Sequence, residues 1–185
     1  MAEEKVSLPS VTQVISPYKD FSQVPEHIIT AAQERGSEFH ALAAAYLMGT
    51  WIPEVPANLE GYFRSFTAWA DAQVEEVIWV EKRLVHPVYR YQGTPDALLR
   101  IRGDSGLLLP DWKTPRAFDR SWIVQTAGYK ELVEINGWPV SRIASLQPHP
   151  EGKTAQFREF TKSLNLGLSV FISLVNAWHF FYGSK

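Results

Sequence analysis

The chain has 185 residues, of which 45% are hydrophobic and 21% are charged, a composition that is ordinary for one soluble globular domain. It contains no cysteine, which excludes disulfides and thiolate metal sites, so any metal must be held by Asp, Glu, His or carbonyl oxygen. The net charge of −2 excludes a protein that binds nucleic acid with its whole surface, so the positive charge for such a partner must be local. The sequence shows neither a signal peptide nor an apolar run that predicts a membrane span, and we expect a cytoplasmic protein that does not bind membranes.

The first 75 residues show helical patterns. Ser10 is a good N-cap for a short helix, and Pro25 suits the first turn of a long helix that ends near Gly49. Apolar residues recur at helical spacing in that long helix and, after a loop at 51–56, in a second helix. These stripes consist of Phe39, Leu42, Ala43, Tyr46 and Leu47 in the first helix, and of Tyr62, Phe63, Phe66, Trp69 and Ala70 in the second. The sequence therefore predicts a helical N-terminal part over 1–75.

Residues 76–185 begin with strand patterns and end with an apolar helix. Runs of β-formers predict a meander of three strands over 77–84, over 88–101 with a break at Gly93, and over 107–113. A helix over 121–136, strands over 140–147 and 156–160, and an apolar helix from about Ser163 follow. The apolar helix is expected to pack against the sheet or a partner chain. This order predicts one α/β domain over 1–185, with a mixed β-sheet flanked by helices and the helix at 121–136 crossing between strands.

Acidic residues stand at one end of the predicted hairpin. Asp96 opens its first strand, and Asp111 closes its second strand after a turn cluster at 103–106. Because antiparallel strands bring these two ends side by side, the two carboxylates can converge on one point. Lys113 follows Asp111 by two residues and so leaves the strand on the same face. Two carboxylates and an amine in this arrangement can hold a divalent metal and position a water molecule beside a phosphate.

The order of these residues resembles a known nuclease family. The pattern Gly93-Thr94-x-Asp96, a turn, then Asp111-Trp112-Lys113-Thr114 and Gln125-x-x-x-Tyr129 is similar to the RecB-type exonuclease branch of the PD-(D/E)XK nuclease superfamily. A bare Asp-x-Lys occurs by chance in many chains, and the ordered set carries the resemblance. Pro9-Ser10-Val11-Thr12 ahead of Arg35-Gly36-x-x-x-His40 is similar to small phage and mitochondrial single-strand exonucleases of the same branch.

The resemblance implies a restriction-endonuclease-like core and a role for each motif residue. Asp96 and Asp111 would bind Mg²⁺ or Mn²⁺ together with the carbonyl of Trp112 and the ring of His40, and Lys113 would complete the catalytic set. On spacing alone, His40 is a core or rim histidine, and Gly36 would let another backbone approach closely.

Glu81 and the DNA contacts complete the candidate site. Glu81 is a possible additional acid near the metals, or else it faces solvent opposite Arg83 or Arg90. By resemblance, Gln125 and Tyr129 would contact the DNA strand and brace the active site. Positive charge near the site in sequence would come from Arg116, Arg120 and Lys130, besides Lys113.

The sequence thus predicts a metal-dependent DNA exonuclease that hydrolyses phosphodiester bonds and requires free ends. It would be of the recombination and repair type and related to phage enzymes, acting in a bacterial or phage-infected cytoplasm, with a possible recombination partner protein. An endonuclease or junction resolvase of the same fold, and a non-catalytic nucleic-acid-binding relative, are the alternatives. The sequence leaves open the cleavage polarity, single or double strands, DNA or RNA, one or two metals, and the oligomeric state.

Overall fold

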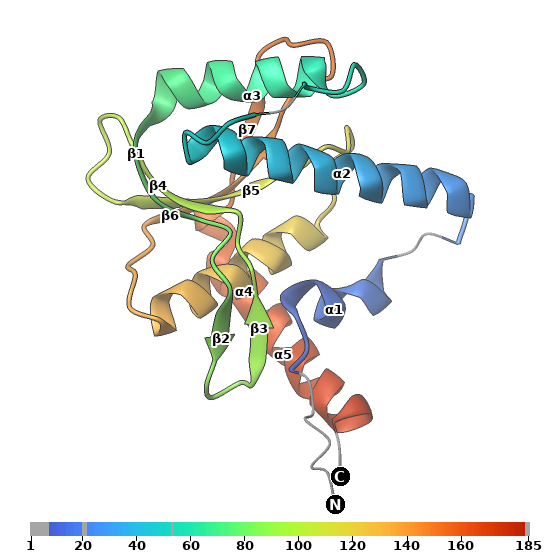
Figure 1. Cartoon of the computed structure of the whole chain (residues 1–185). Helices are drawn as coiled ribbons and strands as arrows, with labels where there is room; N and C mark the ends of the chain where they lie inside the picture. The colour runs from blue at the N-terminus through green and yellow to red at the C-terminus, as the bar shows by residue number, and fades with distance from the viewer. Residues whose placement is uncertain (1–7, 20–21, 53, 184–185) are drawn as a thin grey trace, which may run out of the picture.

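The architecture is a mixed sheet with helices on both faces. The computed structural model describes residues 8–19, 22–52 and 54–183 (Figure 1). Five strands lie in the order β1-β4-β5-β6-β7, and β2 and β3 form a separate two-stranded hairpin. Helices α2 and α3 cover one face of the sheet, whereas α1, α4 and α5 lie on the other (Figure 1). The predicted α/β class, with a mixed sheet flanked by helices, is confirmed.

Alternating side chains of the central strands build two cores. Leu98 and Leu109 point into the core beneath α1, α4 and α5, whereas Leu99 and Leu108 point into the core beneath α2 and α3. The strands are β1 (Val74–Val80), β2 (Leu84–His86), β3 (Tyr91–Gly93), β4 (Ala97–Ile101), β5 (Leu107–Trp112), β6 (Arg142–Gln147) and β7 (Gln156–Glu159). Strands with both faces buried explain why β4 and β5 read as continuous apolar runs.

The connection from β5 to β6 decides the topology. Strands β4 and β5 form the predicted antiparallel hairpin, with Leu99 opposite Leu108. Strand β6 then lies parallel to β5, with Asp111 opposite Ser145. Parallel neighbours need a crossover connection, and α4 (Ser121–Ile135) supplies it, as the sequence predicted.

The predicted meander is wrong at two points. Glu81 adopts a left-handed conformation with φ 45°, so the strand predicted over 77–84 ends at Val80 and the chain leaves the sheet. The strand predicted over 88–101 is likewise interrupted, because Arg90 has φ 52° and lies in a turn. The two outer pieces pair with each other instead, which gives the separate β2–β3 hairpin.

Helix ends follow the local signals in the sequence. Ser10 caps α1 (Val11–Ile15) in a capping box with Gln13, and Gly137 ends α4 with φ 95°. The other helices are α2 (Glu26–Leu47), α3 (Glu60–Gln73) and α5 (Leu164–Tyr182), with short 3₁₀ turns at Ser16–Tyr18 and Thr161–Ser163.

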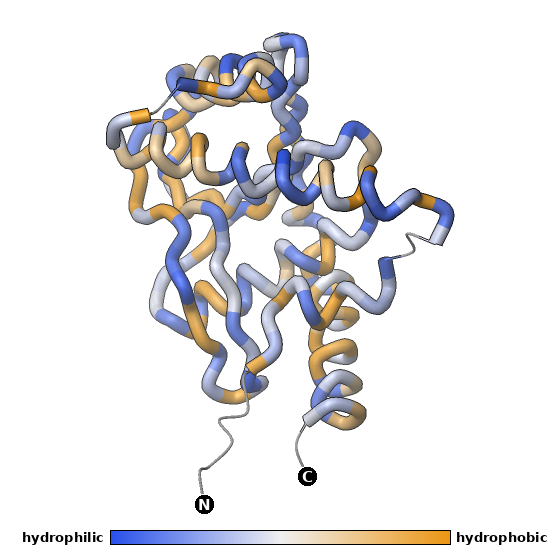
Figure 2. Tube along the Cα trace, turned by 45° about the vertical axis from the view of Figure 1, so that its right-hand side comes forward, coloured by the Kyte–Doolittle hydropathy of each residue, from blue (hydrophilic) through white to orange (hydrophobic). Residues whose placement is uncertain are grey.

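Helix α5 packs on α4 rather than on the sheet. Gly128 and Gly167 permit this close packing, since a Cβ at Gly128 would lie 2.8 Å from the Phe171 ring and one at Gly167 would lie 2.9 Å from the Ile123 carbonyl oxygen. The last turns of α5 extend away from the rest of the chain (Figure 2). Phe180, Phe181 and Tyr182 in these turns are exposed.

The apolar composition of this helix corrects an expectation from the sequence. By length and composition alone, Thr161–Tyr182 could cross a membrane, although no such segment was expected. One such helix is weak evidence for a membrane span, and only 17% of its apolar window is buried, including Phe171 and Val175.

Candidate active site

The two motif carboxylates meet at one end of the β4–β5 hairpin. Asp96 directly precedes β4, and Asp111 is the penultimate residue of β5, so the antiparallel register places them opposite each other. The backbone N–H of Trp112 donates to Asp96 Oδ2 over 2.6 Å, which ties the two strand ends together. Both carboxylates are buried, with side chains 10% and 4% exposed, so this end of the sheet holds two negative groups with little water around them.

His40 reaches this point from α2. Its Nδ1 lies 3.1 Å from Asp96 Oδ1, and its Nε2 lies 3.1 Å from the carbonyl oxygen of Trp112. Because both partners are acceptors, both ring nitrogens must donate, which requires the protonated imidazolium. Burial disfavours that charge, but the charge of Asp96 and the hydrogen bond to it outweigh burial and raise the pKa of His40 to about 9.

Lys113, Asp111 and Gln125 form a closed polar ring. Lys113 Nζ lies 2.5 Å from Asp111 Oδ2 and donates to Gln125 Oε1 over 3.0 Å. Gln125 Nε2 in turn donates to Asp111 Oδ1 over 3.3 Å. Burial raises the pKa of Asp111, as does the charge of Asp96, whereas the Lys113 ammonium opposes the shift. The amide of Gln125 therefore holds both charged groups in fixed positions.

Tyr129 lies one helical turn beyond Gln125 and braces the neighbouring backbone. A Cβ at Gly93 would lie 2.7 Å from the Tyr129 ring, so only glycine allows this contact. Burial raises the pKa of Tyr129, and the charges of Asp111 and Asp96 add to the shift. Both Gln125 and Tyr129 are more than nine-tenths buried, so they support the cluster and offer little surface to a DNA strand.

Glu81 touches this region through its backbone. Its N–H donates to the carbonyl of Asp96 over 2.9 Å, while its side chain is exposed and contacts none of the described site residues. The left-handed backbone of Glu81 is therefore bonded directly to the residue that begins β4.

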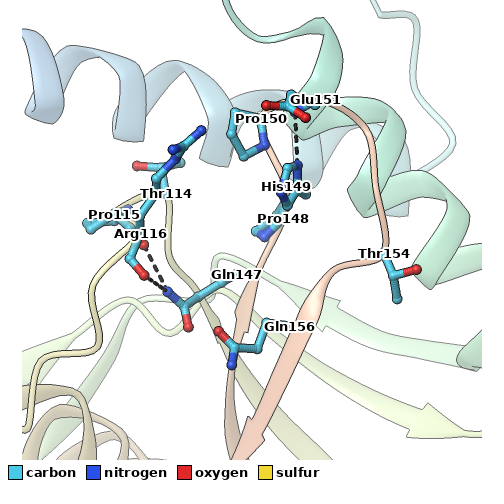
Figure 3. Close-up of a pocket in the computed structure, with 10 residues that line it drawn as sticks. All are labelled: Thr114, Pro115, Arg116, Gln147, Pro148, His149, Pro150, Glu151, Thr154 and Gln156. Carbon is cyan, nitrogen blue, oxygen red and sulfur yellow. Dashed lines mark hydrogen bonds between the residues drawn. The ribbon is translucent and has the colours of Figure 1, made fainter.

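The basic residues named from sequence are dispersed. Arg116 lines a cavity of 310 Å³ beyond the end of β5, where Gln147 donates to the carbonyls of Pro115 and Arg116 (Figure 3). Arg120 is exposed just before α4. Lys130 forms an ion pair with Glu134 on α4, and no contact joins it to the described residues of the cluster.

Gly36 does not have the role expected for it. A Cβ at Gly36 would lie 3.9 Å from Thr114 Oγ1, which is an ordinary van der Waals contact. The expectation that glycine permits a close backbone approach there is wrong, because the space admits alanine.

Lys19 is a cationic neighbour that sequence reasoning missed. Burial lowers the pKa of Lys19, and the charge of Lys113 lowers it further, whereas Asp119 and Asp111 oppose the shift. No motif marks Lys19, because its neighbourhood depends on how the segment after α1 folds back toward β5.

The donor set suits a hard divalent cation. Among residues 8–19, 22–52 and 54–183, no three His, Asp or Glu side chains are arranged as a metal site. In the structure His40 pairs with Asp96, and Lys113 pairs with Asp111. The chemistry of the groups nevertheless fits Mg²⁺ or Mn²⁺, because two buried carboxylates and the Trp112 carbonyl gather here. To become a ligand, His40 would have to release the proton that it now shares with Asp96 or Trp112.

No protein-family model matches the chain, and no curated protein is significantly similar to it. The fold and the site by themselves describe an α/β protein with a mixed five-stranded sheet. A cluster of two aspartates, a lysine and a histidine lies at the end of its central hairpin.

Proposed function

We propose that this protein is a metal-dependent DNA exonuclease of the RecB-type branch of the PD-(D/E)XK superfamily, built on a restriction-endonuclease-like core. It would act in recombination or repair and be related to phage enzymes. One observation carries the proposal. His40, Asp96 and the Asp111–Lys113 segment come from distant parts of the chain and form a connected set of contacts at one end of the central hairpin.

The residues of the cluster have distinct roles in this proposal. Asp96, Asp111 and the Trp112 carbonyl, with His40 in its neutral form, would hold Mg²⁺ or Mn²⁺. The metal would neutralise charge on the scissile phosphate and lower the pKa of a bound water. Lys113, fixed by Asp111 and Gln125, keeps a positive charge beside this point and stabilises negative charge that develops on the phosphate.

The positions of these side chains are preorganised by the fold. Gln125 contacts both Asp111 and Lys113, and Tyr129 packs behind it against Gly93. A fixed ammonium does not have to reorganise during the reaction, which is the condition under which a charged donor contributes most to the rate.

The test is digestion of end-labelled linear DNA and covalently closed circular DNA, single- and double-stranded, with Mg²⁺ or Mn²⁺. We expect degradation of linear DNA from its ends, circles that stay intact, and no reaction in EDTA. Rapid cutting of circles would assign an endonuclease instead. DNA binding without cleavage of any substrate would leave a non-catalytic nucleic-acid-binding protein. A parallel digestion of end-labelled RNA shows whether the substrate is DNA or RNA.

A further inference from the structure

A second cavity lies beside the candidate active site. The N-terminal segment lies alongside β3, with Ser10 bridged to Gln92, so that α1 and the β2–β3 hairpin are neighbours (Figure 1). The cavity between them has a volume of 370 Å³. It is lined by Ser10, Thr12, Arg83, Gln92, Gly93, Thr94 and Tyr129. No carboxylate is among these residues.

Arg83 gives the cavity a positive charge, and its exposed side chain is oriented by Gln92. Its Nε and Nη2 donate to Gln92 Oε1 over 3.3 and 2.7 Å. Gln92 is itself held, because its Nε2 donates to the Leu8 carbonyl over 2.7 Å and its backbone N–H donates to the Pro9 carbonyl over 2.9 Å. A neutral amide orients the guanidinium without neutralising it, and no carboxylate among the described residues forms an ion pair with Arg83. The charge is therefore available to an anion.

Hydroxyl groups line the same cavity as Arg83. Ser10 Oγ and Thr12 Oγ1 lie 3.0 Å apart, and Thr94 lines the cavity from the segment between β3 and β4. A planar guanidinium together with several hydroxyl donors matches the oxygen atoms of a phosphate group.

The cavity and the acid cluster are close enough to act on one strand. Thr94 precedes Asp96 by two residues, so their Cα atoms lie no more than about 7 Å apart. Tyr129 lines the cavity and lies one helical turn from Gln125, which contacts both Asp111 and Lys113. A strand whose scissile phosphate lies at the cluster can therefore place a neighbouring phosphate in the cavity.

We propose that the cavity between α1 and the β2–β3 hairpin binds a phosphate group of the nucleic-acid substrate, with Arg83 as its cationic ligand. This inference rests on the proposed function. The phosphate is either the monoester at a strand end or a diester within the strand, and both present the same oxygen atoms to Arg83.

The test measures binding separately from cleavage. Fluorescein-labelled single strands that carry a 5′-phosphate, a 3′-phosphate or no terminal phosphate are titrated with protein in EDTA, and anisotropy gives the Kd. The variants are Arg83→Gln and Thr94→Val, with Arg90→Gln as the matched control, because Arg90 is exposed on the same hairpin and lies outside the cavity.

We expect Arg83→Gln to raise the Kd by about ten-fold to a hundred-fold, Thr94→Val to raise it less, and Arg90→Gln to leave it near the wild-type value. A loss confined to one end-phosphorylated strand identifies the monoester, and an equal loss on all strands identifies the diester. If Arg83→Gln binds every strand as tightly as Arg90→Gln, the inference is overturned. Failure of the wild-type protein to cleave DNA is a different result, and it bears on the proposed function alone.

Discussion

Two histidines pair with carboxylates in different parts of the molecule, His40 at the candidate active site and His86 in the β2–β3 hairpin. His40 has an acceptor at each ring nitrogen, and its pKa is raised to about 9. His86 accepts at Nδ1 from the backbone N–H groups of Val88 and Tyr89, over 3.3 and 3.0 Å, while its Nε2 lies 3.6 Å from Glu131. Burial lowers the pKa of His86, and the nearby Glu131 only partly opposes this shift.

The difference shows that a carboxylate neighbour does not by itself determine the charge of a histidine. At His86 one ring nitrogen must stay unprotonated to accept two hydrogen bonds, so the ring is neutral and holds the turn. At His40 both nitrogens donate, so the ring carries charge into a cluster of negative groups. We conclude that the hairpin pair holds a neutral ring that stabilises a turn, whereas the cluster at the end of β5 holds a charged ring beside two carboxylates, the arrangement on which the proposed function rests.

Removing the ammonium of the cluster gives the largest expected effect. Lys113→Ala keeps both carboxylates but removes the charge that, under the proposed function, would stabilise the transition state, so single-turnover cleavage should slow by roughly 10²–10³, or about 3–4 kcal/mol. The loss should appear in kcat and not in KM. Lys82→Ala is the control, because Lys82 lies over the Trp138 ring, outside the cluster. Cleavage by Lys113→Ala at the wild-type rate would contradict the Asp-x-Lys interpretation.

Removing the histidine of the hairpin should act on stability instead. His86 is 1% exposed and its ring stacks on Tyr91, so His86→Ala leaves a cavity and two unpaired backbone N–H groups. We expect the free energy of unfolding to fall by about 2–3 kcal/mol. Urea denaturation measures this, with the exposed Val85→Ala as control, and the cleavage rate of the folded variant should stay at the wild-type level. If His86→Ala cleaves DNA much more slowly than the wild type at unchanged stability, the His86–Glu131 pair does not differ in role from the His40–Asp96 pair.

The sequence predicted the cluster better than its surroundings, for a physical reason. Asp96, Asp111 and Lys113 are related by strand periodicity and hairpin register, which are local properties that a sequence states directly. The place of His40 in the cluster was predicted from the family resemblance alone, because no local rule relates His40 to Asp96, which lies 56 positions further along the chain. The break at Glu81 was missed, since its neighbours favour strand and no glycine marks the left-handed conformation.

The environments of Lys19 and Arg83 were also beyond sequence reasoning. Both depend on where the N-terminal segment lies against the rest of the chain, and no motif encodes that contact. Helix α5 was identified correctly as an apolar helix, but its contact with α4 follows from the close approach at Gly128 and Gly167, which composition does not show.

The two histidines should give the metal-free protein opposite pH dependences. The pKa of His40 is higher in the folded state than in the unfolded state, so its contribution to stability is complete below about pH 6.5 and is lost as the pH rises through about 9. The pKa of His86 is lower in the folded state, so its contribution is present above about pH 6.5 and is lost as the pH falls.

Urea unfolding in EDTA across this pH range tests both signs. His40→Asn should abolish the alkaline loss of stability and leave the acid loss, whereas His86→Ala should do the reverse. Each variant is the control for the other. If the two variants show the same pH profile, the contrast between the pairs is wrong.

A glycine near the candidate site offers the smallest effect. Gly36→Ala should raise the free energy of unfolding by about 0.5–1 kcal/mol, because Gly36 lies inside α2 and the added methyl group meets Thr114 at an ordinary distance. Thermal denaturation checks this. Gly93→Ala is the contrasting variant, and it should destabilise the protein because its methyl group would collide with the Tyr129 ring. If Gly36→Ala is less stable than the wild-type protein, the added methyl group meets a closer neighbour than the 3.9 Å spacing to Thr114 Oγ1 indicates, and the original expectation for Gly36 is correct.

A calorimetric titration of the protein with Mn²⁺ tests directly whether the cluster at the end of β5 holds a divalent metal. The wild-type protein should bind Mn²⁺, Lys113→Ala should retain this binding, and Asp111→Asn should weaken it strongly, since it removes a charged ligand and leaves the ammonium of Lys113 unpaired. If the wild-type protein binds no Mn²⁺, or if Asp111→Asn binds it as tightly as the wild type, the cluster is not a metal site.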